Sequence, residues 1–193
     1  IANGGGVSRI ELSGGTFTST TASLTMGVRG HTVLEVAGTA QATVPSVTLG
    51  HAANGGTTNR IFLNGGVLEV HNIGKGGGAM ATLDFNGGTL RARSNNPLFM
   101  QGLNAVTVQA GGGVLDTTNV NITNNQALLD GGGGLTKRGT GTLTLTAANG
   151  YTGLTTVDEG TLALTGSLAG AVAVSSGATL SGTGTVAGAV NNG

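Results

Sequence analysis

Hydrophobic and polar residues alternate along most of this chain, and one alternating phrase returns at a nearly constant interval. The phrase sets two apolar residues around a variable one and then steps into glycine, as in Ile10-Glu11-Leu12-Ser13-Gly14. The first glycines of its five copies stand at positions 14, 38, 65, 87 and 111, so they are 24, 27, 22 and 24 residues apart. Alternation with period two predicts strands, and a repeat of roughly 20–50 residues predicts a solenoid of stacked units.

The two apolar residues of each copy are predicted to lie in the interior of the solenoid, because alternate residues of a strand point to opposite faces. These interior pairs are Ile10/Leu12, Leu34/Val36, Ile61/Leu63, Leu83/Phe85 and Val106/Val108. The residues between them are predicted to form a column on the surface. This outward column consists of Glu11, Glu35, Phe62, Asp84 and Thr107. Phe17 also fits the interior pattern.

A second phrase keeps step with the first and ends in Gly27, Gly50 and Gly74. Together with the segments at 67–70 and 89–92, it indicates about three short strands in each period of about 24 residues. The sequence therefore predicts an all-β protein, a parallel β-helix with glycines at its corners. Asn-Gly pairs at 64–65, 86–87 and 149–150 would also suit the hairpins of an antiparallel sandwich or propeller, but both phrases recur in the same order, which favours the β-helix.

The phrase changes at Gly131. The run Leu135-Thr136-Lys137-Arg138-Gly139-Thr140-Gly141 leads into Asn149-Gly150-Tyr151-Thr152-Gly153, and then into a segment at 155–162. These motifs closely resemble the autotransporter-associated β-strand repeat of bacterial type V passenger domains and large extracellular surface proteins, over about residues 131–190. The resemblance implies a right-handed β-helix, an extracellular or outer-cell-surface location, and a role in export or display rather than chemistry.

The two phrases divide the chain into residues 1–130, with coils of Asn-Gly-Gly type, and residues 131–193, with coils of the autotransporter-associated repeat. We expect the second part to continue the first as one body.

Composition and charge exclude several classes of protein. Glycine supplies 39 of 193 residues, but a hydrophobic fraction of 38% and regular glycine spacing oppose disorder. Eight basic and eight acidic side chains cancel to a net charge of zero, so no basic stripe predicts a nucleic-acid partner. No apolar run approaches the roughly 18 residues of a membrane-spanning helix, and we expect no membrane insertion by this segment.

The candidate chemistry is sparse. The eight carboxylates are scattered, and the chain has no cysteine. His31, His51 and His71 are evenly spaced, but they are offset from the second phrase, so they are not expected to stack into a zinc site. The glycine runs lack the Gly-x-x-x-x-Gly-Lys-Ser/Thr pattern of a phosphate loop. We predict no enzyme activity, no catalytic or metal-binding residue and no cofactor.

Phe62 is the one candidate surface contact, since it is the only aromatic residue of the predicted outward column. The favoured function is structural, a β-helical rod of a secreted bacterial surface protein that serves extension, display or end-to-end assembly. The first alternative is an adhesin that binds a glycan or a host protein, through side loops such as residues 54–59. A polysaccharide-active enzyme is a further alternative, but it would need converging carboxylates.

Neither end of the chain carries a polar or helical cap of the kind that closes native solenoids. The expected partners are therefore neighbouring coils of a longer chain, or other copies stacked end to end into a filament.

Overall fold

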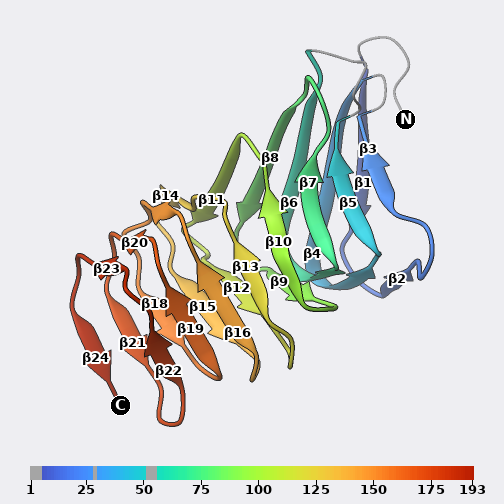
Figure 1. The fold of residues 1–193 in the computed structure, drawn as a ribbon. Helices are drawn as coiled ribbons and strands as arrows, with labels where there is room; N and C mark the ends of the chain where they lie inside the picture. The colour runs from blue at the N-terminus through green and yellow to red at the C-terminus, as the bar shows by residue number, and fades with distance from the viewer. Residues whose placement is uncertain (1–5, 28–29, 51–55) are drawn as a thin grey trace.

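The computed structural model describes residues 6–27, 30–50 and 56–193, and every regular element in this part is a β-strand. The strands stack side by side from the blue N-terminal end to the red C-terminal end, so the molecule is a rod of successive coils (Figure 1). The predicted parallel β-helix is confirmed.

The largest sheet has 13 strands and runs the whole length of the rod. Its members are β1 (Val7–Leu12), β2 (Thr16–Thr18), β4 (His31–Thr43), β6 (Thr58–Val70), β8 (Met80–Phe85), β9 (Thr89–Ala92), β11 (Ala105–Gln109), β12 (Gly113–Asp116), β14 (Leu129–Gly131), β15 (Leu135–Arg138), β18 (Thr155–Val157), β21 (Val172–Val174) and β24 (Val190–Asn192). The long strands β4 and β6 each cover two sides of a coil, which in later coils are separate strands such as β8 and β9.

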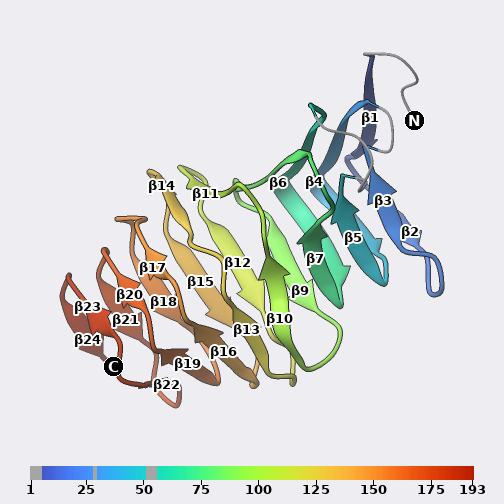
Figure 2. The same ribbon diagram turned by 45° about the horizontal axis from the view of Figure 1, so that its top comes forward.

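Two smaller sheets complete the coils, as the turned view of the rod shows (Figure 2). The eight-stranded sheet contains β3 (Leu24–Met26), β5 (Ser46–Leu49), β7 (Asn72–Lys75), β10 (Asn96–Gln101), β13 (Ile122–Asn124), β16 (Thr142–Leu145), β19 (Thr161–Leu164) and β22 (Thr179–Ser181). The three-stranded sheet contains β17 (Ala148–Asn149), β20 (Ser167–Leu168) and β23 (Thr185–Val186).

The register of the strands follows the first repeated phrase. Ile10 pairs with Leu34, Leu34 with Ile61, and Ile61 with Leu83, all in parallel. The outward column is in register as well, because Glu11, Glu35, Phe62, Asp84 and Thr107 pair in that order. Alternation decides this register, since a slip of one residue would turn every apolar side chain to the surface.

The interior is a set of continuous apolar columns. The four predicted pairs from Leu34/Val36 to Val106/Val108 are at most 2% exposed. Burying one such side chain stabilises the fold by roughly 1.5–3 kcal/mol, so the columns hold the coils together.

The prediction was wrong for the first coil. Ile10 is 45% exposed and Phe17 is 48% exposed, and Leu12 is only half-buried. These side chains point along the interior columns, but in the described residues a neighbouring coil covers them on one side only. Burial in a solenoid requires a coil on both sides.

The predicted register of the second phrase is wrong by two residues at its third copy. Val47 pairs with Ile73 and Leu49 with Lys75, so Gly50 corresponds to Gly76 and not to Gly74. A shift of two residues keeps the same side chains inside, and for this reason alternation alone cannot detect it.

The coils shrink toward the C-terminal end. One coil advances 27 residues from Leu34 to Ile61, whereas later coils advance 20 from Thr136 to Thr156 and 17 from Thr156 to Ala173. The large sheet nevertheless continues through both predicted parts of the chain. In the described residues, no helix is long and apolar enough to cross a membrane.

Candidate functional site

A polar network lies on the outer face of the large sheet, where charges alternate from coil to coil. This charge ladder consists of Glu69, Arg91, Asp116, Arg138 and Asp158, from β6, β9, β12, β15 and the residue after β18. Register places Glu69 beside Arg91, Arg91 beside Asp116, and Asp116 beside Arg138. Alternating signs therefore follow one column of the rod across five coils.

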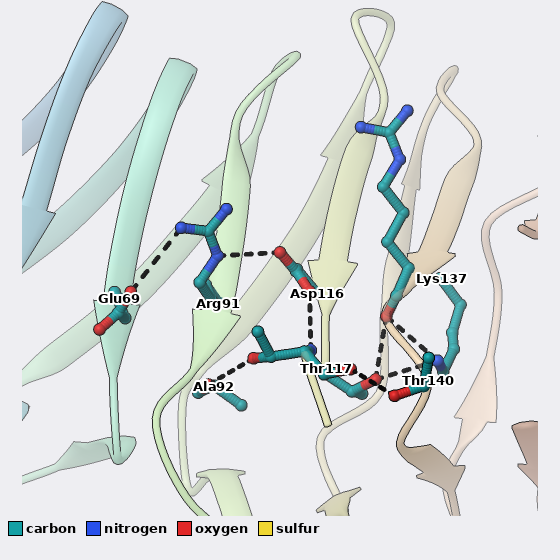
Figure 3. A network of polar contacts seen from close by, with 9 residues as sticks. Glu69, Arg91, Ala92, Asp116, Thr117, Lys137 and Thr140 are labelled. Atoms are coloured by element: carbon teal, nitrogen blue, oxygen red, sulfur yellow. Dashed lines mark hydrogen bonds and ion pairs between the residues drawn. The ribbon is translucent and has the colours of Figure 1, made fainter. Parts of the chain in front are cut away.

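Three ion pairs are formed within the ladder. Arg91 donates from Nε to Asp116 at 2.8 Å and lies 3.7 Å from Glu69, as Figure 3 shows. Arg138 Nε lies 3.2 Å from Asp158. Ion pairs at a surface contribute only about 0–1 kcal/mol each, so each pair adds little to the stability of the fold.

Lys137 is the unexpected member of this region, because its side chain is fully buried. It lies in β15 between two outward residues, and its column continues with Leu115 on one side and Val157 on the other. The site residues that the sequence predicts do not include Lys137. The alternation Leu135, Lys137 was the available signal, since it sets both residues on the inner face.

The buried ammonium group of Lys137 has four acceptors. Its Nζ donates to Thr117 Oγ1 at 3.0 Å and to the carbonyl oxygens of Arg138 at 3.1 Å, Glu159 at 2.9 Å and Gly139. Figure 3 shows the side chain pointing toward Thr117 beside the charge ladder. Burial lowers the pKa of Lys137 to about 8, and the carboxylates of Asp116 and Glu159 oppose this shift.

A second buried polar pair follows in the same repeat. The hydroxyl of Tyr151 lies 2.7 Å from Thr155 Oγ1, and both side chains are fully buried. Burial raises the pKa of Tyr151 to about 12, while the hydrogen bond to Thr155 acts in the opposite direction. Neither Lys137 nor Tyr151 reaches the surface, so both groups serve the interior.

The predicted surface contact Phe62 is half-buried in its column between Glu35 and Asp84. Its neighbours already have polar partners, since Glu35 accepts from Asn64 at 2.7 Å and Asp84 from Gln109 at 2.7 Å. The carboxylates of this column are thus engaged along the rod and do not converge on a common point.

The histidines are divided between different columns. His31 Nδ1 accepts from the backbone amide of Thr58 at 2.9 Å, whereas His71 Nδ1 lies 2.8 Å from Ser94 Oγ. His51 lies outside the described residues, as do the first two residues of the side loop 54–59. Over residues 6–27, 30–50 and 56–193, no group of three or more His, Cys, Asp or Glu side chains could hold a metal ion.

The His71–Ser94 pair is the nearest approach to a nucleophile and its base. A hydrolytic set also needs a carboxylate that orients the histidine. The described hydrogen bonds of His71 include none to a carboxylate. The pair links two coils at a corner.

Comparison with known proteins agrees with the motifs of the C-terminal coils. The family model of the passenger-associated-transport-repeat matches residues 135–164. This segment is an autotransporter-associated repeat. It contains Lys137, Tyr151 and Thr155, so the buried polar groups described above belong to the repeat.

Two curated proteins are similar to parts of the chain. The adhesin BmaC autotransporter of Brucella suis biovar 1 (strain 1330) is 38% identical over 112 residues, which are 58% of this chain and 3% of that protein. An extracellular serine protease of Serratia marcescens is 52% identical over 58 residues, which are 30% of this chain and 6% of that protein. The chain thus spans a small fraction of either relative. No solved structure shows a significant match.

The repeat and the two relatives support a secreted passenger segment in general terms. The charge ladder pairs charges between coils, and the contacts of Lys137 hold the coils together.

Proposed function

We propose that this chain is a rod segment of a secreted bacterial surface protein, and that it extends or displays other parts of that protein. The observation that supports this role is the large parallel sheet, which continues from β1 to β24 through every coil. Each coil adds roughly 4.8 Å of length, so a solenoid converts sequence directly into reach.

The surface chemistry agrees with a structural role. Charged side chains on the outer face pair along the rod, as Arg91 does with Asp116 and Arg138 with Asp158. Glycoside hydrolysis needs two carboxyl groups that flank the scissile bond, whereas each ladder carboxylate is directed at an arginine of a neighbouring coil. We therefore also propose that the segment is not an enzyme.

Neighbouring coils of the same polypeptide are the partners that best suit the ends. At the N-terminal end, Val7 is 68% exposed, and a cavity of about 90 Å³ opens between Ile10, Phe17 and Leu24. A coil there advances 24 residues, from Ile10 to Leu34, but the last coil advances 18, from Val172 to Val190. A second copy stacked end to end would join coils of different perimeter and leave apolar surface uncovered.

An adhesin remains the second candidate, because a relative that matches 58% of the chain is named an adhesin. Phe62 is its candidate contact, and the ligand would be a glycan or a host protein. Binding would take place on the side of the rod, where Phe62 lies among the outward residues of β6.

Measurements of shape, binding and hydrolysis on the 193-residue chain test these functions. X-ray scattering and sedimentation should show a rod-shaped monomer, and a glycan array and an array of host surface proteins should show no saturable binding. Saturable binding that Phe62→Ala abolishes, and that Leu98→Ala at an exposed position in β10 does not, would instead support the adhesin. Fibres that grow with concentration would support assembly of copies, and hydrolysis of polygalacturonate or chitin would refute the non-enzymatic role.

A further inference from the structure

Lys137 connects three consecutive coils through one atom. Its acceptors are Thr117 Oγ1 in the coil before it, the carbonyl oxygens of Arg138 and Gly139 in its own coil, and that of Glu159 in the coil after it. The ammonium group is therefore satisfied only when all three coils are stacked in this order.

The rest of its column is apolar. In the inward positions before Lys137 stand Leu68, Leu90 and Leu115, and Val157 and Val174 follow. If the coil of β15 were skipped or exchanged with another coil, Lys137 would lose some of its acceptors. Its ammonium group would then face only the apolar side chains of this column. A buried ammonium without partners is strongly destabilising, whereas a leucine that meets a valine in place of another leucine costs much less.

The charge ladder distinguishes the same coils from outside. Its signs alternate in the order Glu69, Arg91, Asp116, Arg138, Asp158, so neighbouring coils attract. Skipping one coil would set like charges side by side, for example Asp116 beside Asp158. Like charges directly opposite in a sheet are destabilising, and the penalty falls on the same misalignment that Lys137 opposes.

We propose that Lys137 and the charge ladder form a register lock, which determines that the coil of β15 stacks between the coils of β12 and β18. The need for such a lock follows from the repeats themselves. Apolar alternation is nearly the same in every coil, so it selects the inner face but does not identify the neighbouring coil. Polar groups that are buried or paired in one arrangement supply that specificity.

The absence of cysteine from the chain permits a direct test with reporter disulfides. Thr144 pairs with Ala163 in the adjacent coil, and Thr123 pairs with Thr144. The pair Thr144→Cys/Ala163→Cys reports the native stacking. The pair Thr123→Cys/Ala163→Cys spans two coils, roughly 9.6 Å, and can close only when the intervening coil is looped out, because disulfides need Cα atoms within about 7 Å.

Each reporter pair is placed in three backgrounds, the unmodified chain, Lys137→Met and Lys75→Met. Lys75 is the other lysine of the chain and is half-buried in β7, so it controls for the loss of a lysine. After refolding and oxidation, we expect the native disulfide in all three. The disulfide that reports a skipped coil should rise at least tenfold in Lys137→Met and stay at the background level in Lys75→Met.

Thr117→Val serves as the second variant, since it removes one acceptor and leaves the lysine in place. If Lys137→Met shows no cooperative unfolding transition, it is not folded and its disulfides cannot be interpreted. Thr117→Val then provides the test, and an increase of the skipped-coil disulfide above background in this variant supports the lock. The proposal is overturned if a folded Lys137→Met forms the native disulfide alone, if Lys75→Met has an equal effect, or if Thr117→Val stays at background when Lys137→Met cannot be read.

Discussion

At the residue scale, the two buried ionisable groups of the repeat should shape the pH dependence of stability. The pKa of Lys137 is about 8 in the folded chain and 10.5 in its ordinary state. The unfolded chain binds this proton more tightly, so the free energy of unfolding should rise between pH 8 and 10.5, by up to about 3 kcal/mol. Urea denaturation at pH 7, 9 and 10 measures this rise, and Lys137→Met should abolish it.

Tyr151 should act with the opposite sign. Its pKa is raised from 10.0 to about 12, so the folded chain keeps a proton that the unfolded chain loses above pH 10. The free energy of unfolding should therefore fall between pH 10 and 12. Tyr151→Phe should flatten this fall and leave the rise below pH 10 unchanged. A fall of the same size in Tyr151→Phe would assign it to other groups.

Three glycines allow the cost of backbone strain to be distinguished from the cost of steric crowding between coils. Gly139 has φ +82°, and a Cβ there would lie 2.3 Å from the backbone nitrogen of Thr118. Gly177 has the same φ with open space around it, and Gly150 has open space without a positive φ. Left-handed backbone costs an L-residue roughly 1–2 kcal/mol, and overpacking adds roughly 1–3 kcal/mol.

Replacement by alanine should therefore have graded effects. We expect Gly150→Ala to change the free energy of unfolding by less than about 1 kcal/mol, Gly177→Ala to cost about 1–2 kcal/mol, and Gly139→Ala to cost about 2–5 kcal/mol. Chemical denaturation of the three variants provides the measurement. Equal losses of unfolding free energy in Gly139→Ala and Gly177→Ala would show that the coils of Gly139 and Thr118 can move apart to accommodate the added methyl group.

At the element scale, the inner and outer faces of the strands should differ in what they contribute. Leu83 and Leu143 are fully buried in β8 and β16, and their replacement by alanine should cost roughly 2–5 kcal/mol through lost burial and a cavity. Arg60→Ala on the exposed face of β6 should stay within about 0.5 kcal/mol. Denaturant midpoints decide this, and similar losses for all three variants would contradict the observed faces.

Glu35 occupies an intermediate place on the outer face. Its side chain is 13% exposed and accepts hydrogen bonds from Arg9 and Asn64. Removing a charged acceptor of this kind costs about 1–3 kcal/mol, so position in an outward column does not by itself make a residue neutral.

At the scale of the whole molecule, stability should be highest in the middle of the rod. The strands β1, β2 and β3 pair with one neighbour each within the described residues, as do β22, β23 and β24 at the other end. A solenoid is stabilised by its coil–coil interfaces, so the end coils should open most readily. Amide hydrogen exchange of the isolated chain should be slowest in central strands with a neighbour on both sides, such as β8, β12, β13 and β16, and fastest in the end strands.

A dilution series is the control for this measurement. Exchange at the ends should not depend on protein concentration, because the proposed partners of the ends belong to the same polypeptide. Protection of β1 and β24 that increases with concentration would instead show that copies stack end to end.

The sequence by itself determined the fold class, the repeat and the two faces of the strands. Burial of the pairs from Leu34/Val36 to Val106/Val108 follows from alternation. Successive side chains of a strand point to opposite faces, so the apolar positions alone decide which face is buried. The family resemblance at 131–190 was also legible from local motifs, since it depends on consecutive residues.

Only the tertiary structure decided features that depend on the neighbouring coil. Alternation places Lys137 inside, but its four acceptors come from residues 20 and 22 positions away as well as from adjacent ones. The exposure of Ile10 and Phe17 and the two-residue offset of the second phrase have the same origin. A repeated pattern specifies the face a residue occupies, whereas its contacts depend on coil lengths and corner geometry, which the pattern leaves open.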